Sequence, residues 1–223
     1  FQIAQNAIAP QVRHADLQAV GARLHVEAGA VHPLAVSWFR QQADAVLADW
    51  TPDAIKIGML ASARLVREVA GLLDRLDGVP AILDPVLAAS SGAALIDEGG
   101  IRAMRAQLLP RVRMITPNQC EAAKLLGSRI RGEAGMVRAA ERLRALGPAA
   151  VVITGGDRRG EPIDVLCDER GVLVLRGRRI TSRNARGTGC RHSAALAALL
   201  AGGHTLRTAV RKARAFVRTH LAS

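Results

Sequence analysis

The chain has 223 residues, of which 49% are hydrophobic and 22% are charged, with a mean hydropathy of +0.14. This composition is typical of a globular protein with a large apolar core and excludes a disordered chain. The longest apolar run, Ala194 to Ala201, is much shorter than the roughly 18 residues that a membrane helix needs, so we expect no membrane span.

The net charge is +12, from 31 lysines and arginines against 19 acids. The basic residues are spread along the chain, which disfavours a dedicated nucleic-acid surface, although a positive field would attract a phosphorylated substrate or a nucleotide. The cysteines have no CxxC or Cys/His metal spacing, and this pattern favours a reducing cytoplasm over a disulfide framework. They are Cys120, Cys167 and Cys190.

Short apolar runs alternate with longer stretches of helical period. The sequence predicts strands at 54–58, 80–85, 113–117 and 149–155, and helices at 15–20, 22–27, 37–49, 62–76, 99–109, 118–126 and 135–146. A hairpin is expected at 163–167 and 172–176, followed by helices at 191–200 and 206–221. This order predicts an α/β fold, with a mostly parallel sheet covered by helices on both faces. We find no linker or repeat and expect one domain, residues 1–223.

Gly187, Thr188 and Gly189 precede a predicted helix. Two glycines let the backbone N–H groups turn inward, and the helix N-terminus adds its own donors, so the segment could form an anion hole. An ordinary loop followed by a helix cap is equally consistent with this sequence. At this helix terminus we expect a lowered pKa for the Cys190 thiol, which could then act as a base or nucleophile. The alternative is a small packing residue.

Polar residues also follow the predicted strands. Asn118 and Glu121 have the spacing of a helix capping box, and this is the commoner meaning of the pattern; alternatively they hold a hydrated Mg²⁺. Asp84 ends a buried strand, where an acid needs a cation or water. Because ligands gather beyond the carboxyl ends of parallel strands, these residues and the glycine loop together predict a phosphoryl-transfer site.

Five motifs carry a family resemblance, in the same order and at similar separations: KIGML, LDPVL, ITPNQCEAAKLLG, VVITGGD and NARGTGCRHSAALAALLA. From about Val31 onward, the chain resembles the hydroxymethylpyrimidine and phosphomethylpyrimidine kinases of thiamine biosynthesis, within the ribokinase superfamily. The resemblance implies a ribokinase-like three-layer sandwich that uses ATP and Mg²⁺. It also implies a homodimer that phosphorylates 4-amino-5-hydroxymethyl-2-methylpyrimidine and then its monophosphate.

The same resemblance implies roles for individual residues. The catalytic set is Cys190, as the base, with Gly187, Thr188 and Gly189 as the anion hole. The Mg²⁺ ligands are Asp84 and Glu121, and the nucleotide and phosphate contacts are Asn118, Thr154 and Gly156. The pyrimidine contacts are Met59, Val86 and Gln5.

The chain departs from the family in three places. The glycine-rich strand and loop of the family N-terminus is absent, and residues 7–30 are longer than the matching segment. Thr154 replaces a lysine that meets nucleotide phosphates, and Arg183, Arg186 or Arg191 could supply the missing charge. The alternatives are a pyridoxine or pyridoxal kinase and, because of these departures, a pyrimidine-binding protein without turnover. The positive charge suggests a further alternative, RNA association through the basic segment 207–218.

Overall fold

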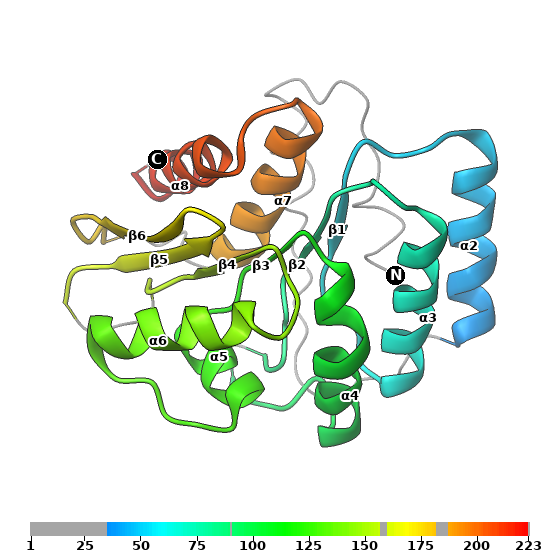
Figure 1. The fold of residues 1–223 in the computed structure, drawn as a ribbon, viewed down its shortest axis with the longest axis horizontal. Helices are drawn as coiled ribbons and strands as arrows, with labels where there is room; N and C mark the ends of the chain where they lie inside the picture. Colours follow the sequence, from blue (N-terminus) through cyan, green and yellow to red (C-terminus); the bar gives the residue numbers. More distant parts are fainter. Residues whose placement is uncertain (1–34, 90, 157–159, 182–186, 223) are drawn as a thin grey trace.

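The computed structural model describes residues 35–89, 91–156, 160–181 and 187–222. Gln5 and the helices expected at 15–20 and 22–27 lie outside these residues. Within them the chain folds around one six-stranded sheet, whose strands follow one another in sequence order (Figure 1).

The sheet contains β1 (Ile55–Ile57), β2 (Ala81–Leu83), β3 (Met114–Ile115), β4 (Ala150–Ile153), β5 (Ile163–Asp168) and β6 (Gly171–Arg176). The first four strands are parallel, and every one of their residues is buried, as expected for strands covered on both faces. β5 and β6 form an antiparallel hairpin along β4. The carboxyl ends of β1 to β4 therefore meet at one edge, beside the start of β5.

One face of the sheet is covered by the helices that connect the parallel strands (Figure 1). These are α3 (Ala63–Arg75), α4 (Glu98–Ala103), α5 (Gln119–Leu126) and α6 (Gly132–Arg144), with α2 (Val36–Asp49) packed outside α3. Their apolar sides form the larger core cluster, which includes Val66, Leu108, Leu125 and Met136.

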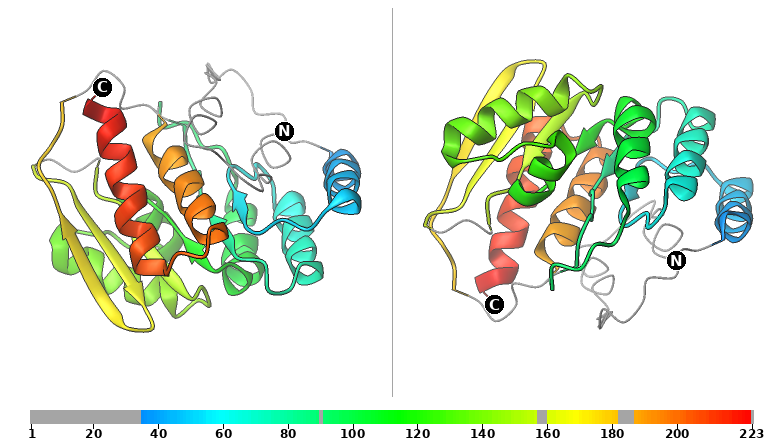
Figure 2. Two further views of the ribbon diagram at one scale, coloured as in Figure 1. Left: turned by 90° about the horizontal axis from the view of Figure 1, so that it is seen from above. Right: turned by 90° about the horizontal axis from the view of Figure 1, so that it is seen from below.

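The other face is covered by α7 (Thr188–Ala201) and α8 (Leu206–Ala222), which lie side by side, with α8 running across the hairpin (Figure 2). Leu196, Ala209 and Val210 pack there against Ile82 and Val152 of the sheet. The three layers, helices on sheet on helices, confirm the predicted α/β fold.

Several boundaries differ from the sequence prediction: the helix expected at 135–146 is Gly132–Arg144, and the parallel strands are shorter than the predicted apolar runs. The helix expected at 99–109 is α4 continued by a π-helical turn (Met104–Leu108) and a 3₁₀ turn (Leu109–Arg111); Pro110 has no amide hydrogen to donate to the preceding turn, so the α-helical hydrogen bonds cannot continue through it. The helix expected from Arg191 begins at Thr188, so Thr188 and Gly189 lie in its first turn and Gly187 directly precedes it. Among the described residues, none of the helices has the length and apolarity required to cross a bilayer.

Candidate active site

Asp84 lies directly after β2, at the edge where the parallel strands end. It is buried, at 5% exposure, and its Oδ2 accepts a hydrogen bond from Ser193 Oγ of α7 at 3.0 Å. Lys56 Nζ of β1 lies 3.8 Å from the same oxygen and is buried as well. A buried carboxylate needs this kind of compensation, because an unpaired charge in the interior is costly.

Gly58 explains how the Lys56 ammonium reaches the strand end. A Cβ atom built on Gly58 would lie 2.9 Å from Lys56 Nζ, so a larger residue would crowd the ammonium. The glycine in the KIGML motif therefore leaves space for the cation that faces Asp84.

Cys190 lies in the first turn of α7, beside Asp84. The pKa of the thiol is raised to about 11, first by the loss of hydration among the surrounding protein atoms and then by the charge of Asp84 and a hydrogen bond to it, while Lys56 opposes the shift. Cys190 nevertheless keeps solvent-exposed surface. The expectation that the helix N-terminus lowers this pKa is wrong, because desolvation and the neighbouring carboxylate outweigh the helix dipole; the thiol is neutral at pH 7.

The start of α5 lies at the same edge. Asn118 Oδ1 accepts a hydrogen bond from the Glu121 amide at 2.9 Å, and Glu121 Oε2 accepts one from the Asn118 amide at 2.8 Å. The capping box predicted from the spacing is confirmed. Glu121 also acts electrostatically on the Cys190 thiol, so the cap brings this carboxylate close to α7.

The end of β4 is joined to the end of β3. The Thr154 amide donates to the Pro117 carbonyl at 2.9 Å, and Thr154 pairs with Asn118 in a parallel bridge. Gly156 follows within two residues and is exposed. Asn118, Thr154 and Gly156 are thus brought together, as the sequence predicts.

Gly187 precedes α7 with a φ of +74°, a left-handed conformation that favours glycine. No side chain caps the helix there, and Thr188 and Gly189 form its first turn. These three residues therefore surround the helix terminus next to Cys190, which is the arrangement that anions favour.

Met59 and Val86 follow the adjacent parallel strands β1 and β2 and are partly buried. Both lie at the edge that carries Asp84. Gln5 lies outside the described residues.

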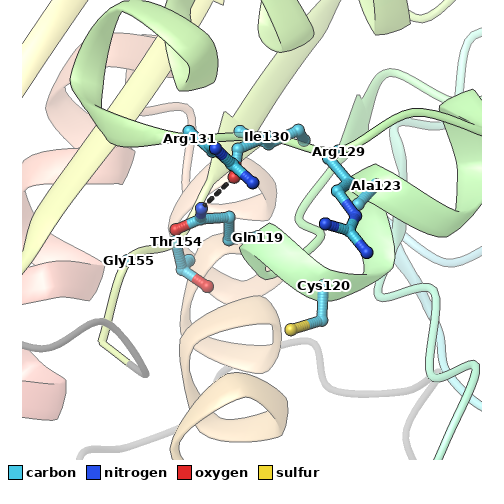
Figure 3. Close-up of a pocket in the computed structure, with 8 residues that line it drawn as sticks. All are labelled: Gln119, Cys120, Ala123, Arg129, Ile130, Arg131, Thr154 and Gly155. Atoms are coloured by element: carbon cyan, nitrogen blue, oxygen red, sulfur yellow. Dashed lines mark hydrogen bonds between the residues drawn. The ribbon is translucent and has the colours of Figure 1, made fainter.

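A shallow hollow of about 360 Å³ opens beside Thr154 and Gly155, between the first turn of α5 and the α5–α6 loop (Figure 3). Gln119 Nε2 donates to the Ile130 carbonyl at 2.7 Å across it. Arg129 extends from the loop toward Cys120, and Arg131 lines the hollow on the side of Gln119, so two basic side chains contribute to its wall.

In the described part of the chain, no three His, Cys, Asp or Glu side chains form a group that could hold a metal ion by themselves. Asp84 and Glu121 are two carboxylates of the sheet edge that both act on the Cys190 thiol. A pair of this kind fits Mg²⁺, which commonly takes one or two protein carboxylates and completes its shell with water and phosphate oxygens.

The sequence prediction missed Lys56 and Ser193 as site residues. A lysine inside the apolar run of β1 must find a counter-charge, and this requirement could have signalled Lys56. Ser193 follows Cys190 by three residues and therefore shares its helix face, which was a usable signal too.

Comparison with known proteins agrees with this geometry. The family model described as phosphomethylpyrimidine kinase matches residues 16–223. The hydroxymethylpyrimidine/phosphomethylpyrimidine kinase of Bacillus subtilis is 37% identical over 204 residues, which cover 91% of this chain and 75% of that protein. The thiamine biosynthesis bifunctional protein ThiED of Geobacter sulfurreducens is 36% identical over 188 residues, 84% of this chain; the match spans only 38% of that longer protein.

Solved structures are similar over most of the chain. The phosphomethylpyrimidine kinase of Clostridium difficile superposes with a TM-score of 0.77 at 26% identity, covering 92% of this chain and 90% of that one. An ADP complex of Bacillus subtilis pyridoxal kinase gives a TM-score of 0.75 at 31% identity, covering 83% and 69%. With the family model matching nearly the whole sequence, this chain belongs to the phosphomethylpyrimidine kinase family.

Proposed function

We propose that this protein uses ATP to phosphorylate the hydroxymethyl group of 4-amino-5-hydroxymethyl-2-methylpyrimidine and then the resulting monophosphate, as a kinase of thiamine biosynthesis. The observation that carries the proposal is the position of Cys190, in the first turn of α7 and under the electrostatic influence of both Asp84 and Glu121. A helix N-terminus facing strand-end carboxylates is suited to transferring a phosphoryl group between two bound molecules.

In the reaction, the pyrimidine hydroxyl oxygen bonds to the γ-phosphorus of ATP, the bond from that phosphorus to its bridging oxygen breaks, and ADP leaves. The amides of Gly187, Thr188 and Gly189 donate hydrogen bonds to the transferring group and stabilise its charge. Bound at Asp84 and Glu121, Mg²⁺ would neutralise phosphate charge.

Cys190 receives the hydroxyl proton in this proposal. In the ligand-free protein the thiol is neutral, with a pKa raised to about 11 by desolvation and then by Asp84. Only the thiolate can accept the hydroxyl proton, so the thiol first releases its own proton to the solvent that its exposed surface contacts, and it is protonated again when the hydroxyl oxygen bonds to phosphorus. Lys56 is a neighbouring cation that favours the thiolate. We propose that it partly offsets the rise that Asp84 causes in the pKa of Cys190.

The remaining residues hold the two substrates. Asn118, Thr154 and Gly156 contact the nucleotide phosphates, where the joined ends of β3 and β4 support them. Met59 and Val86 line the pyrimidine pocket, together with Gln5. We further propose that residues 1–223 form one kinase domain, which works in the cytoplasm as a homodimer.

The test is an ADP-release assay with ATP, Mg²⁺ and the pyrimidine alcohol or its monophosphate, and pyridoxal as a competing acceptor. We expect turnover of both pyrimidines, and a loss of about a hundredfold in kcat for Cys190→Ala, the usual contribution of a general base. Cys120→Ala, which removes the exposed cysteine of α5, is the matched control and retains activity.

Each other outcome has a defined meaning. Turnover of pyridoxal alone would make the protein a pyridoxal kinase, a name that several similar structures carry. Pyrimidine binding without ADP release would make it a binding protein, and either result overturns the proposal.

A further inference from the structure

Asp164 of β5 lies outside every motif considered above, yet it contacts the end of β4. Its Oδ1 accepts a hydrogen bond from the Gly155 amide at 3.0 Å, and its Oδ2 accepts one from Arg214 Nε of α8 at 2.7 Å. Both side chains of the ion pair are largely buried, with exposures of 14% and 17%. A single carboxylate therefore joins the turn after β4 to the last helix.

This contact fixes one side of a turn that is held from several directions. The Thr154 amide donates to the Pro117 carbonyl, so consecutive amides are anchored on opposite neighbours, one on the β3 end and the other on β5. Beyond them, Arg179 donates to the Gly156 carbonyl at 3.1 Å. Thr154 and Gly156, the proposed nucleotide contacts, are thereby held in one arrangement around Gly155.

Arg214 neutralises the carboxylate at a place where phosphates are expected. Its other nitrogens donate to the carbonyls of Leu175 and Arg176, which keeps the guanidinium against the hairpin. His192, two residues after Cys190, also faces Asp164, but burial lowers its pKa and keeps it neutral. Without Arg214, a negative charge would remain beside the nucleotide phosphates.

We infer that Asp164, held by Arg214, is a positioning residue for ATP: it fixes the Thr154–Gly156 turn in the geometry that receives the nucleotide phosphates. The inference rests on the proposed kinase function, and it assigns to the hairpin and α8 a part in nucleotide affinity.

The chain contains its own control for this inference. Asp168, four residues further along β5 on the same sheet face, accepts two hydrogen bonds from Arg207 of α8, at 2.7 and 2.8 Å. This second pair also joins α8 to the hairpin, but it lies at the opposite end of β5, beside the hairpin turn and far along the strand from Gly155. The two ion pairs therefore both attach α8 to β5, but only the pair with Asp164 contacts the turn after β4.

The experiment measures the dissociation constant of ATP by calorimetry, the KM for ATP and for the pyrimidine, and the unfolding temperature. We expect Asp164→Ala to weaken ATP binding by about tenfold, the loss of one charge-assisted hydrogen bond, with little change in the pyrimidine KM. Asp164→Asn, which retains an oxygen acceptor for Gly155, should recover part of the affinity. Both alanine variants should lower the unfolding temperature by similar amounts, because each loses one ion pair between β5 and α8. Asp168→Ala should nevertheless leave ATP binding unchanged.

If the alanine variants fold poorly, Arg214→Met and Arg207→Met provide the same comparison from α8. The inference is overturned if Asp164→Ala and Asp168→Ala bind ATP equally well, or if Arg214→Met and Arg207→Met do. It is also overturned if Asp164→Ala changes the KM for the pyrimidine as much as the KM for ATP. Wild-type protein that binds ATP but releases no ADP would refute the proposed function alone, since the binding comparison still reports on Asp164. Wild-type protein that does not bind ATP would refute both.

Discussion

In the ligand-free protein, desolvation and then Asp84 raise the pKa of the Cys190 thiol to about 11. Since only the thiolate is alkylated, Cys190 should react slowly with iodoacetamide at pH 8, and its rate should keep rising toward pH 11. Asp84→Asn removes a negative charge and should raise the rate at pH 8 several-fold, since one pKa unit is a tenfold change in thiolate. Mass spectrometry of the peptide containing Cys190 measures this rate.

The experiment is best done in a Cys120→Ala background with a chelator present, so that the exposed thiol of α5 and adventitious cations do not interfere. A rate that already levels off near pH 8, or that Asp84→Asn leaves unchanged, would contradict the raised pKa.

His192 makes a second prediction at the residue scale. It is buried in α7, its Nδ1 has no hydrogen-bond partner among the described residues, and burial lowers its pKa from 6.5, against the opposing charges of Asp164 and Asp84. Below pH 6.5 the unfolded chain takes up a proton that the folded protein resists, so stability is lost as the pH falls through this range. The unfolding temperature should therefore drop between about pH 7.5 and about pH 5.5.

His192→Leu removes the titrating group and the unpaired nitrogen together. We expect the variant to be at least as stable as the wild type at pH 5.5 and to show a smaller drop over the same range. Thermal unfolding followed by circular dichroism measures both; an identical pH dependence in the two proteins would show that His192 is not responsible.

At the scale of elements, local signals predicted most of the fold. The apolar runs of β1 to β4 and the Asn118–Glu121 spacing act within a few residues, so the strands and the α5 cap could be read directly from the sequence. The ion pairs of α8 with β5 could not, because Asp164 and Asp168 meet Arg214 and Arg207 only after the hairpin folds under the helix. The raised pKa of Cys190 depends likewise on the folded protein, first through desolvation and then through Asp84, which is over a hundred positions away.

Gly147, in the turn between α6 and β4, packs closely against the 3₁₀ turn that contains Pro110. It has a φ of +122°, and a Cβ atom there would lie 2.6 Å from Pro110 Cα, in the backbone of the 3₁₀ turn. Gly78 also has a positive φ, of +81°, but nothing lies within 4 Å of its Cβ position. Both alanine substitutions carry the backbone cost, and only Gly147→Ala adds a clash with the backbone.

We therefore expect Gly147→Ala to lower the free energy of unfolding by about 1 to 3 kcal/mol more than Gly78→Ala. Urea denaturation of the two variants measures the difference. Equal losses would mean that the turn after α6 shifts freely and that its contact with Pro110 is not tight.

At the scale of the whole molecule, the lysines and arginines outnumber the aspartates and glutamates that could pair with them. Several acids are already engaged by arginines, as in Arg40 with Glu68 and Arg75 with Asp44, and the net charge of +12 remains over the surface. Such a field raises the encounter rate with anionic ligands and is weakened by salt. In the proposed reaction, ATP and the phosphorylated pyrimidine are anions, whereas the pyrimidine alcohol is uncharged.

The three substrates should therefore respond differently to ionic strength. Between about 0.05 M and about 0.5 M salt the screening length shrinks roughly threefold, and kcat/KM for ATP and for the phosphorylated pyrimidine should fall several-fold. The value for the uncharged alcohol, measured at saturating ATP, should change little. Steady-state kinetics at matched salt concentrations separate the effects. An equal loss for all three substrates would point to a salt effect on the enzyme itself, because a long-range field cannot act on a ligand that carries no charge.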